Sequence, residues 1–175
     1  MILNDIIFGK FVIAIISIFC ISAISLSTMQ GLGMKFTASM SGDQVAPPTE
    51  TSINGTASFR TTAYDTMIKY KIKIAGSSDV SSADIHLGKK GENGETVVDL
   101  LKGSKKNGIK LGTSIRGNVT SSDLQGSLKG KLLVDLISEM KNGNAYVNID
   151  TPYYDNGKVR GQIDPVHKIN STRTE

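Results

Sequence analysis

The sequence predicts an all-β domain: an antiparallel β-sandwich of the Greek-key, immunoglobulin-like type with one short helix, preceded by a hydrophobic helix. Apolar and polar residues alternate with a period of two, most clearly over residues 68–74, where apolar side chains alternate with three lysines. Gly and Asn residues separate these segments and are typical of turns. A single uncharged apolar segment lies near the N-terminus.

That apolar segment comes first in the chain. Residues 11–34 contain no charged side chain. As a helix, this segment is long enough to cross a bilayer of about 30 Å. We assign residues 1–33 to a signal peptide or an N-terminal membrane anchor, in which residues 6–28 would span the membrane if they are not cleaved. Ser25 and Ser27 form the pattern of small residues that suits cleavage by signal peptidase. Either alternative predicts an extracytoplasmic protein, membrane-anchored or secreted.

The rest of the chain is expected to form one domain. A length of 175 residues and 39% apolar composition fit a single core, which we place at residues 34–165, followed by a polar tail at 166–175. The only cysteine, Cys20, lies in the apolar segment. Disulfides are therefore not expected to stabilise the domain.

Strands are predicted in order along the domain. Alternation at residues 36–40 and 57–59 predicts the first two, separated by a long loop at 41–52. The remaining strands are expected at residues 68–74, 83–86, 95–101, 114–119, 145–151 and 158–163.

Turn and helix signals complete the fold. Asp155, Asn156 and Gly157 predict a tight turn that pairs residues 146–147 with residues 159–160. Thr120 and Asp123 fit a capping box that opens a short helical turn. A short helix is predicted before Gly143 by apolar residues spaced three and four apart: Leu133, Leu136, Ile137 and Met140.

Several of these segments together resemble a known family. They are Phe36-Thr-Ala38, the acidic and Pro-rich loop 42–49, Gly55 to Phe59, Ala83-Asp-Ile-His86, Gly94 to Leu100, Gly117 to Thr120, Asp123-Leu124, Ala145 to Thr151 and Gly157 to Ile163. In this order they resemble the chordin-type domain, CHRD. The resemblance implies a β-sandwich outside the cytoplasm. Similar domains in animal chordins lie within a secreted growth-factor antagonist, which by analogy favours a role in binding.

A metal site is one hypothesis for this domain. The family commonly has histidines where this chain has Asp84 and Asp150, whereas His86 is retained; Lys158 replaces a residue that is usually acidic. Asp84 and His86 share one face of a strand, and a neighbouring Asp150 would complete a site for a divalent ion such as manganese, iron, zinc or calcium. The alternative is a polar cluster without metal, in which a carboxylate holds His86.

Arg160 and Gln162 are predicted to belong to a structural ion-pair network. We expect Arg160 to pair with the carboxylate of Asp84 or Asp150 and thereby to fix two strands. The competing interpretation is that Arg160 binds an anionic ligand.

A stripe of lysines suggests a second site. Lys69, Lys71 and Lys73 share one strand face in a chain of net charge +4. They form either a solvated face or a contact for an acidic polymer or an anionic membrane surface. Nucleic acid is not expected in the predicted compartment. Sequons at Asn54, Asn118 and Asn170 would suit glycosylation of an exported domain.

The sequence contains no recognisable catalytic motif. It has no Gly-x-Ser-x-Gly elbow, no phosphate-binding loop and no cysteine in the domain. We therefore predict an exported or membrane-tethered module that acts by non-catalytic binding or structural display at the cell surface, with a surface protein or acidic polymer as partner. The alternative is a metal-binding β-sandwich, redox or hydrolytic, that uses Asp84, His86 and Asp150.

Overall fold

The structure is a computed structural model that describes residues 33–76, 80–102, 114–151 and 154–166. The predicted signal peptide or anchor, with Cys20, lies outside these residues, as do Asn170 and most of the predicted tail. Within the described ranges, no helix has the length and apolar character needed to cross a membrane.

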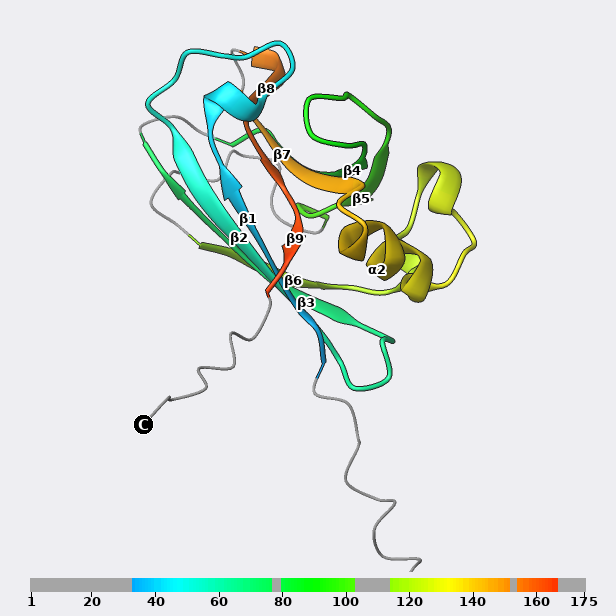
Figure 1. The fold of residues 1–175 in the computed structure, drawn as a ribbon. Coiled ribbons are helices and arrows are strands. Elements are labelled where there is room, and N and C mark those ends of the chain that lie inside the picture. Colours follow the sequence, from blue (N-terminus) through cyan, green and yellow to red (C-terminus); the bar gives the residue numbers. More distant parts are fainter. Residues whose placement is uncertain (1–32, 77–79, 103–113, 152–153, 167–175) are drawn as a thin grey trace, which may run out of the picture. The chain divides into compact units, whose positions relative to one another are not determined.

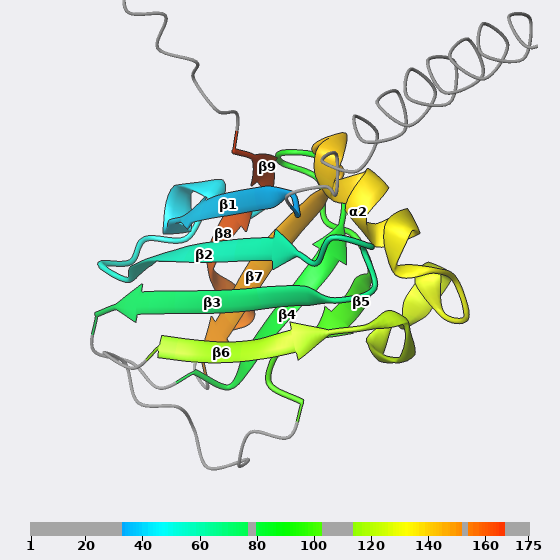
Figure 2. The same ribbon diagram turned by 90° about the horizontal axis from the view of Figure 1, so that it is seen from below.

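Two antiparallel sheets form a sandwich, as predicted (Figure 1). Sheet A has the order β6-β3-β2-β1-β9, with β1 at Lys35–Met40, β2 at Asn54–Thr61, β3 at Ile68–Ala75, β6 at Ser114–Val119 and β9 at Asp164–Pro165. Sheet B has the order β5-β4-β7-β8, with β4 at Ser82–Leu87, β5 at Thr96–Asp99, β7 at Ala145–Thr151 and β8 at Tyr154–Gln162. Figure 2 shows sheet A in front of sheet B, with the strands of the two sheets crossing obliquely.

The core lies between the sheets because each strand directs alternate residues inward. In β2 every second residue is buried over its whole length, and β1 shows the same pattern. Ile68 and Ile72 of sheet A belong to one core cluster with Ile85 and Val147 of sheet B. Each such side chain contributes about 1.5–3 kcal/mol when fully buried. The outward positions of both sheets are left for polar residues.

The predicted helix is present as α2, Leu133–Lys141, at one end of the sandwich (Figures 1 and 2). It buries the four expected residues, Leu133, Leu136, Ile137 and Met140. Its first turn is held by the Asp135 carboxylate, which accepts from the Leu132 amide at 3.0 Å. Gly143, with φ of 68°, ends the helix in the left-handed conformation that glycine favours.

Within the described ranges, three 3-10 turns complete the fold, η2 at Gly42–Gln44, η3 at Ser121–Asp123 and η4 at Gly126–Leu128. The first belongs to the predicted long loop. The predicted capping box opens η3, where the Thr120 amide donates to the Asp123 carboxylate at 2.9 Å.

The turn predicted at Asp155, Asn156 and Gly157 is wrong. These residues lie inside β8, and pairing continues to Thr151 opposite Tyr154. The predicted strands do pair, but Tyr146 lies opposite Gln162 rather than Val159 or Arg160. The pairing of β7 with β8 therefore runs past the predicted turn, to Thr151 and Tyr154.

Candidate functional site

The outer face of sheet B gathers the residues that were predicted to bind a metal or to form an ion-pair network. Because inward positions are apolar, alternation turns polar residues outward on three neighbouring strands. These are Ser82, Asp84 and His86 on β4, Tyr146, Asn148 and Asp150 on β7, and Arg160 and Gln162 on β8. The register places His86 opposite Tyr146, and Asn148 opposite Arg160.

Tyr146 lies at the centre of this face. Its ring stacks on the His86 ring with centroids 5.0 Å apart and planes 11° apart. The Arg160 guanidinium carbon lies 3.5 Å from the centroid of the same ring. Since β7 lies between β4 and β8, the imidazole and the guanidinium approach Tyr146 from the two flanking strands. Cation–π contact of this kind contributes about 0.5–2 kcal/mol.

The loop at residues 88–94 is held down by these side chains. Arg160 Nη2 donates to the Lys89 carbonyl at 2.7 Å. The Gly94 amide donates to the Tyr146 hydroxyl at 3.1 Å, and the Gly94 carbonyl lies 3.0 Å from His86 Nδ1. We call His86, Tyr146, Arg160, Gln162 and this loop the polar network. Its side chains bond mainly to backbone, which indicates a structural task.

Gln162 joins three parts of the backbone within the polar network. Its Nε2 lies 3.0 Å from the Gly88 carbonyl, 2.7 Å from the Gly143 carbonyl and 2.9 Å from the Ala145 carbonyl. The loop 88–94 and the turn after α2 are thereby fixed to β8. Buried carbonyl groups without a donor are costly, so this one side chain supports two connections.

Gly161, between the two network residues, allows another segment to approach. A Cβ at this position would lie 2.6 Å from the Ser39 carbonyl oxygen and 2.8 Å from Met40 Cγ. The approach lets Ser41 and Arg160 exchange backbone hydrogen bonds of 3.0 and 3.1 Å. The Arg-Gly-Gln segment thus anchors the start of the 41–52 loop as well as the 88–94 loop.

The expected ion pair of Arg160 is not formed. Asp84 and Asp150 do not pair with it, and in the described ranges one ion pair is present, between Lys102 and Asp123. The reason is that Arg160 turns towards Tyr146 and the Lys89 carbonyl instead. The side chain is only 2% exposed, and burial is the main cause that lowers the pKa of Arg160. Nη1 has no partner among the described residues.

Asp84, His86 and Asp150 share the outer face but are not brought to one point. Asp150 pairs with Ser82, four residues before His86, which is roughly 13 Å along the strand. Its carboxylate accepts from Ser82 Oγ at 2.7 Å and Asn148 Nδ2 at 2.8 Å. Among the residues that the structure describes, no three His, Cys, Asp or Glu side chains are grouped to hold a metal ion.

Asp84 lies between those two residues and is half-buried. Burial is the main cause that raises the pKa of Asp84, and the charges of Asp99 and Asp150 add to it. Ser82 and His86 act in the opposite direction. An aspartate of this kind is a poorly solvated acid beside other acids, a situation that favours its neutral form.

The outer face of sheet A has a different composition. Each lysine that was predicted to face outward does so, and further cations lie beside them on neighbouring strands. Six cations share this surface, which we call the basic face: Lys35, Arg60, Lys69, Lys71, Lys73 and Arg116. The described strands of sheet A contain one acidic residue, Asp164 at the edge, opposite Thr37.

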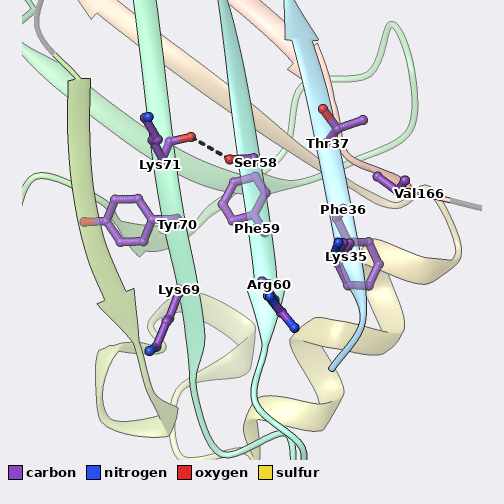
Figure 3. A pocket seen from close by; sticks show the side chains of 10 residues that line it. All are labelled: Lys35, Phe36, Thr37, Ser58, Phe59, Arg60, Lys69, Tyr70, Lys71 and Val166. Carbon is purple, nitrogen blue, oxygen red and sulfur yellow. Dashed lines mark hydrogen bonds between the residues drawn. The ribbon is translucent and has the colours of Figure 1, made fainter. Parts of the chain in front are cut away.

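Strand register arranges these cations in rows. Arg60 of β2 lies opposite Lys35 of β1 on one side and Lys69 of β3 on the other. Figure 3 shows these three side chains on adjoining strands. In the next row, Lys71 lies opposite Arg116. A groove of about 420 Å³ crosses β1, β2 and β3 here and is lined by four of the cations.

The cations of the basic face repel one another. Arg116 and Lys73 are the main causes that lower the pKa of Lys71, which is the direction expected for a cation among cations. None of the six forms an ion pair within the described part of the chain. Such a surface favours an external anion.

Asn54 and Asn118, two of the three predicted glycosylation sites, are exposed on strands of sheet A. Asn118 lies opposite Lys69, so a glycan there would border the basic face.

Half of the basic face and the central ring of the polar network were not predicted from the sequence. Lys35, Arg60 and Arg116 are single cations on separate strands, and Tyr146 is one aromatic residue in an apolar segment. The available signal was their outward phase in the alternation. It becomes informative only once the register between strands is known.

Comparison with known families agrees with this architecture. Residues 36–163, most of the chain, match the CHRD domain. A search of curated proteins finds no match.

Proposed function

We propose that this chain, which belongs to the CHRD domain family, is an exported or membrane-tethered module that acts by binding an acidic polymer of the cell surface through its basic face. The observation that carries the proposal is the set of six cations on sheet A, which have no carboxylate partner within the described residues. The uncharged segment at residues 11–34 supports export.

The form of the basic face favours a linear polymer. Lys35, Arg60 and Lys69 run across three strands about 4.8 Å apart, and lysines on β3 repeat about every 6.6 Å along the strand. Charges at regular spacing can contact successive acidic groups of one chain. The same three residues line the groove in Figure 3, which suits an extended ligand better than a flat bilayer.

A non-catalytic role fits the residues of sheet B. His86 stacks on Tyr146 and contacts the Gly94 carbonyl, and Arg160 bonds the Lys89 carbonyl. These side chains hold backbone in place. The arrangement supports stable display of the basic face on the opposite side of the sandwich.

Binding to dextran sulfate, with uncharged dextran as the matched polymer, tests the proposal. The full chain in a neutral detergent should bind dextran sulfate and not dextran, and added salt should weaken binding through screening. Changing Lys69, Lys71 and Lys73 together to Glu should reduce affinity by roughly a hundredfold or more, since each charge near an anionic surface contributes about 1 kcal/mol.

The matched control changes Lys129, Lys131 and Lys141 to Glu. These exposed lysines lie outside sheet A and give the same change in net charge. Equal losses in the two triple variants would contradict a defined binding face. If the chain bound vesicles with anionic lipid but not dextran sulfate, the partner of the basic face would be a membrane surface and not a polymer.

A further inference from the structure

The large apolar side chains that are exposed among the described residues gather at one end of the sandwich. There are four of them: Tyr64, Leu132, Val134 and Val166. Tyr64 is 77% exposed and Leu132 is 68% exposed. Single exposed apolar residues are ordinary, but several on neighbouring segments mark a contact surface. We call these four residues the apolar end.

The connections of sheet A place α2 beside the turn that follows β2. Tyr64 lies in this turn, which joins β2 to β3. β6 ends opposite the start of β3, and the chain continues from there through η3 to α2. The Leu133 amide, between Leu132 and Val134, donates to Ser121 Oγ of η3 at 3.2 Å. Figure 2 shows α2 and the β2–β3 turn at the same end of sheet A.

The chain also enters the domain at this end. The Met34 amide donates to Thr61 Oγ1 at 3.0 Å, directly before the β2–β3 turn. The Val166 amide donates to the Lys35 carbonyl at 2.8 Å, so Val166 lies beside the start of β1. The uncharged segment at residues 11–34 therefore leads straight into the apolar end.

The linker between the proposed membrane span and the domain is short. If residues 6–28 span a bilayer, six residues, 29–34, separate the span from β1. Six residues reach at most about 22 Å, which is less than the roughly 26 Å length of an eight-residue strand such as β2. The linker thus holds the apolar end near the bilayer surface at a high effective concentration.

The charges around the apolar end suit an anionic bilayer. Lys129 and Lys131, both exposed, come shortly before α2. Two nearby acids are engaged within the protein, since Asp135 holds the first turn of α2 and Asp123 forms an ion pair. Asp65, in the β2–β3 turn, is only partly exposed. Basic side chains beside tyrosine and aliphatic residues are typical of contacts with the membrane interface.

We propose that the apolar end rests on the bilayer that anchors the chain, with its apolar side chains in the interfacial layer and Lys129 and Lys131 beside anionic headgroups. The inference rests on the membrane-tethered form of the proposed function. The bilayer then occupies one end of the sandwich and leaves the outer face of sheet A free for the polymer. Because the strands of sheet A run away from this end, the basic face is presented sideways to the surroundings.

Tryptophan reporters in the full chain test the contact, because the chain has no tryptophan of its own. Tyr64→Trp and Leu132→Trp each place one reporter at the apolar end. Ala75→Trp is the matched control, since Ala75 is exposed at the other end of β3, about 23 Å along the strand from Ile68. Each variant is reconstituted into vesicles of phosphatidylcholine and phosphatidylglycerol, with and without bromine on the lipid chains.

Bromine quenches tryptophan only where the ring contacts the lipid. Brominated lipid should quench Tyr64→Trp and Leu132→Trp at least about twofold and Ala75→Trp by less than about 1.2-fold. Addition of Tyr64→Ser should reduce the quenching of Leu132→Trp by about half or more, because the native side chains make the contact together. Equal quenching at all three positions, or none at Tyr64 and Leu132, would overturn the proposal.

Two further measurements separate this inference from the proposed function. Flotation of the vesicles reports the tether: a chain that does not float overturns both tether and contact, whereas one that floats without quenching overturns the contact alone. Dextran sulfate binding should change by less than about twofold in Tyr64→Ser, because this residue is remote from Lys71 and Lys73. If polymer binding fails while quenching is retained, the membrane contact is supported and only the role of the basic face is refuted.

Discussion

The two outer faces of the sandwich arise from the same alternation of apolar and polar residues, but their polar side chains differ in burial and in hydrogen bonding. On sheet B, loops cover the polar side chains, and those side chains bond to the loops: Arg160 and Gln162 reach the Lys89 and Gly88 carbonyls. On sheet A, five of the six cations are exposed and Lys71 is partly exposed, and none pairs with an acid in the described residues. On sheet B most polar side chains bond within the protein, although Arg160 Nη1 has no partner among the described residues, whereas on sheet A the charges are left for a partner.

The residues that identify the family differ from those that we propose to bind a partner. The segments that resemble the CHRD signature, around His86 and Arg160 to Gln162, build the polar network and hold two loops. These residues stabilise the fold. The basic face uses residues outside the Arg-Gly-Gln segment, so the proposed polymer binding concerns this chain and does not follow from family membership.

The largest effect is expected from Gln162→Leu. Loss of Nε2 leaves the carbonyls of Gly88, Gly143 and Ala145 without this donor, which should lower the free energy of unfolding by about 2–4 kcal/mol. Thermal unfolding of the full chain measures the change. The control Gln125→Leu, at an exposed position, should change stability by less than about 0.5 kcal/mol. Equal effects in both variants would contradict a structural role for the network.

Tyr146→Phe should affect the 88–94 loop locally. The variant removes the hydroxyl that accepts from the Gly94 amide at 3.1 Å, a bond that contributes about 0.5–1.5 kcal/mol. Hydrogen exchange at the Gly94 amide should accelerate. The matched variant Tyr70→Phe removes a hydroxyl that donates to the Leu100 carbonyl and should leave Gly94 unchanged. If the Gly94 amide exchanged at the same rate in Tyr146→Phe and in the wild type, the role of the Tyr146 hydroxyl in holding this loop would be contradicted.

Lys71→Gln should affect binding without reducing stability. Removal of one charge from the basic face is expected to weaken dextran sulfate binding roughly fivefold. Stability should not fall, because the charges of Arg116 and Lys73 that lower the pKa of Lys71 are repulsive. Lys129→Gln, outside sheet A, is the control and should bind like the wild type. A destabilised Lys71→Gln variant would show that the basic face has a structural role.

The smallest effect is expected from Asp84→Asn. Burial raises the pKa of Asp84 above its ordinary value of 3.8, so the folded state binds the proton more tightly than the unfolded state. Ionisation of Asp84 therefore lowers stability as pH rises through the folded pKa. Asp84→Asn should raise the melting temperature at pH 7, and the gain should vanish once pH falls below the unfolded pKa. A variant that is less stable at pH 7 would contradict this.

Local patterns predicted the sandwich but not the contacts that complete it. The alternation of β3 and the spacing of Leu133, Leu136, Ile137 and Met140 depend on neighbouring residues, so the sequence shows them directly. The partner of Arg160 was predicted wrongly because it is a backbone carbonyl 71 residues away, at Lys89. The misplaced turn at Asn156-Gly157 likewise reflects a local preference that the pairing of β7 with β8 overrides.

The same limit explains why the predicted metal ligands are not brought together. Asp84, His86 and Asp150 have the outward phase that the sequence indicated, but the register of β4 with β7 spreads them along the sheet. Register is a property of two strands and is not encoded in the spacing within either of them.

A map of backbone amide shifts in the ¹⁵N-labelled full chain, with and without dextran sulfate, tests the central claim most directly. The account predicts that the shifts gather at the outward residues of β1, β2, β3 and β6, around Arg60, Lys69 and Lys71, and leave the loop at residues 88–94 unchanged. Shifts that gather at that loop and at Tyr146, with sheet A unchanged, would contradict it.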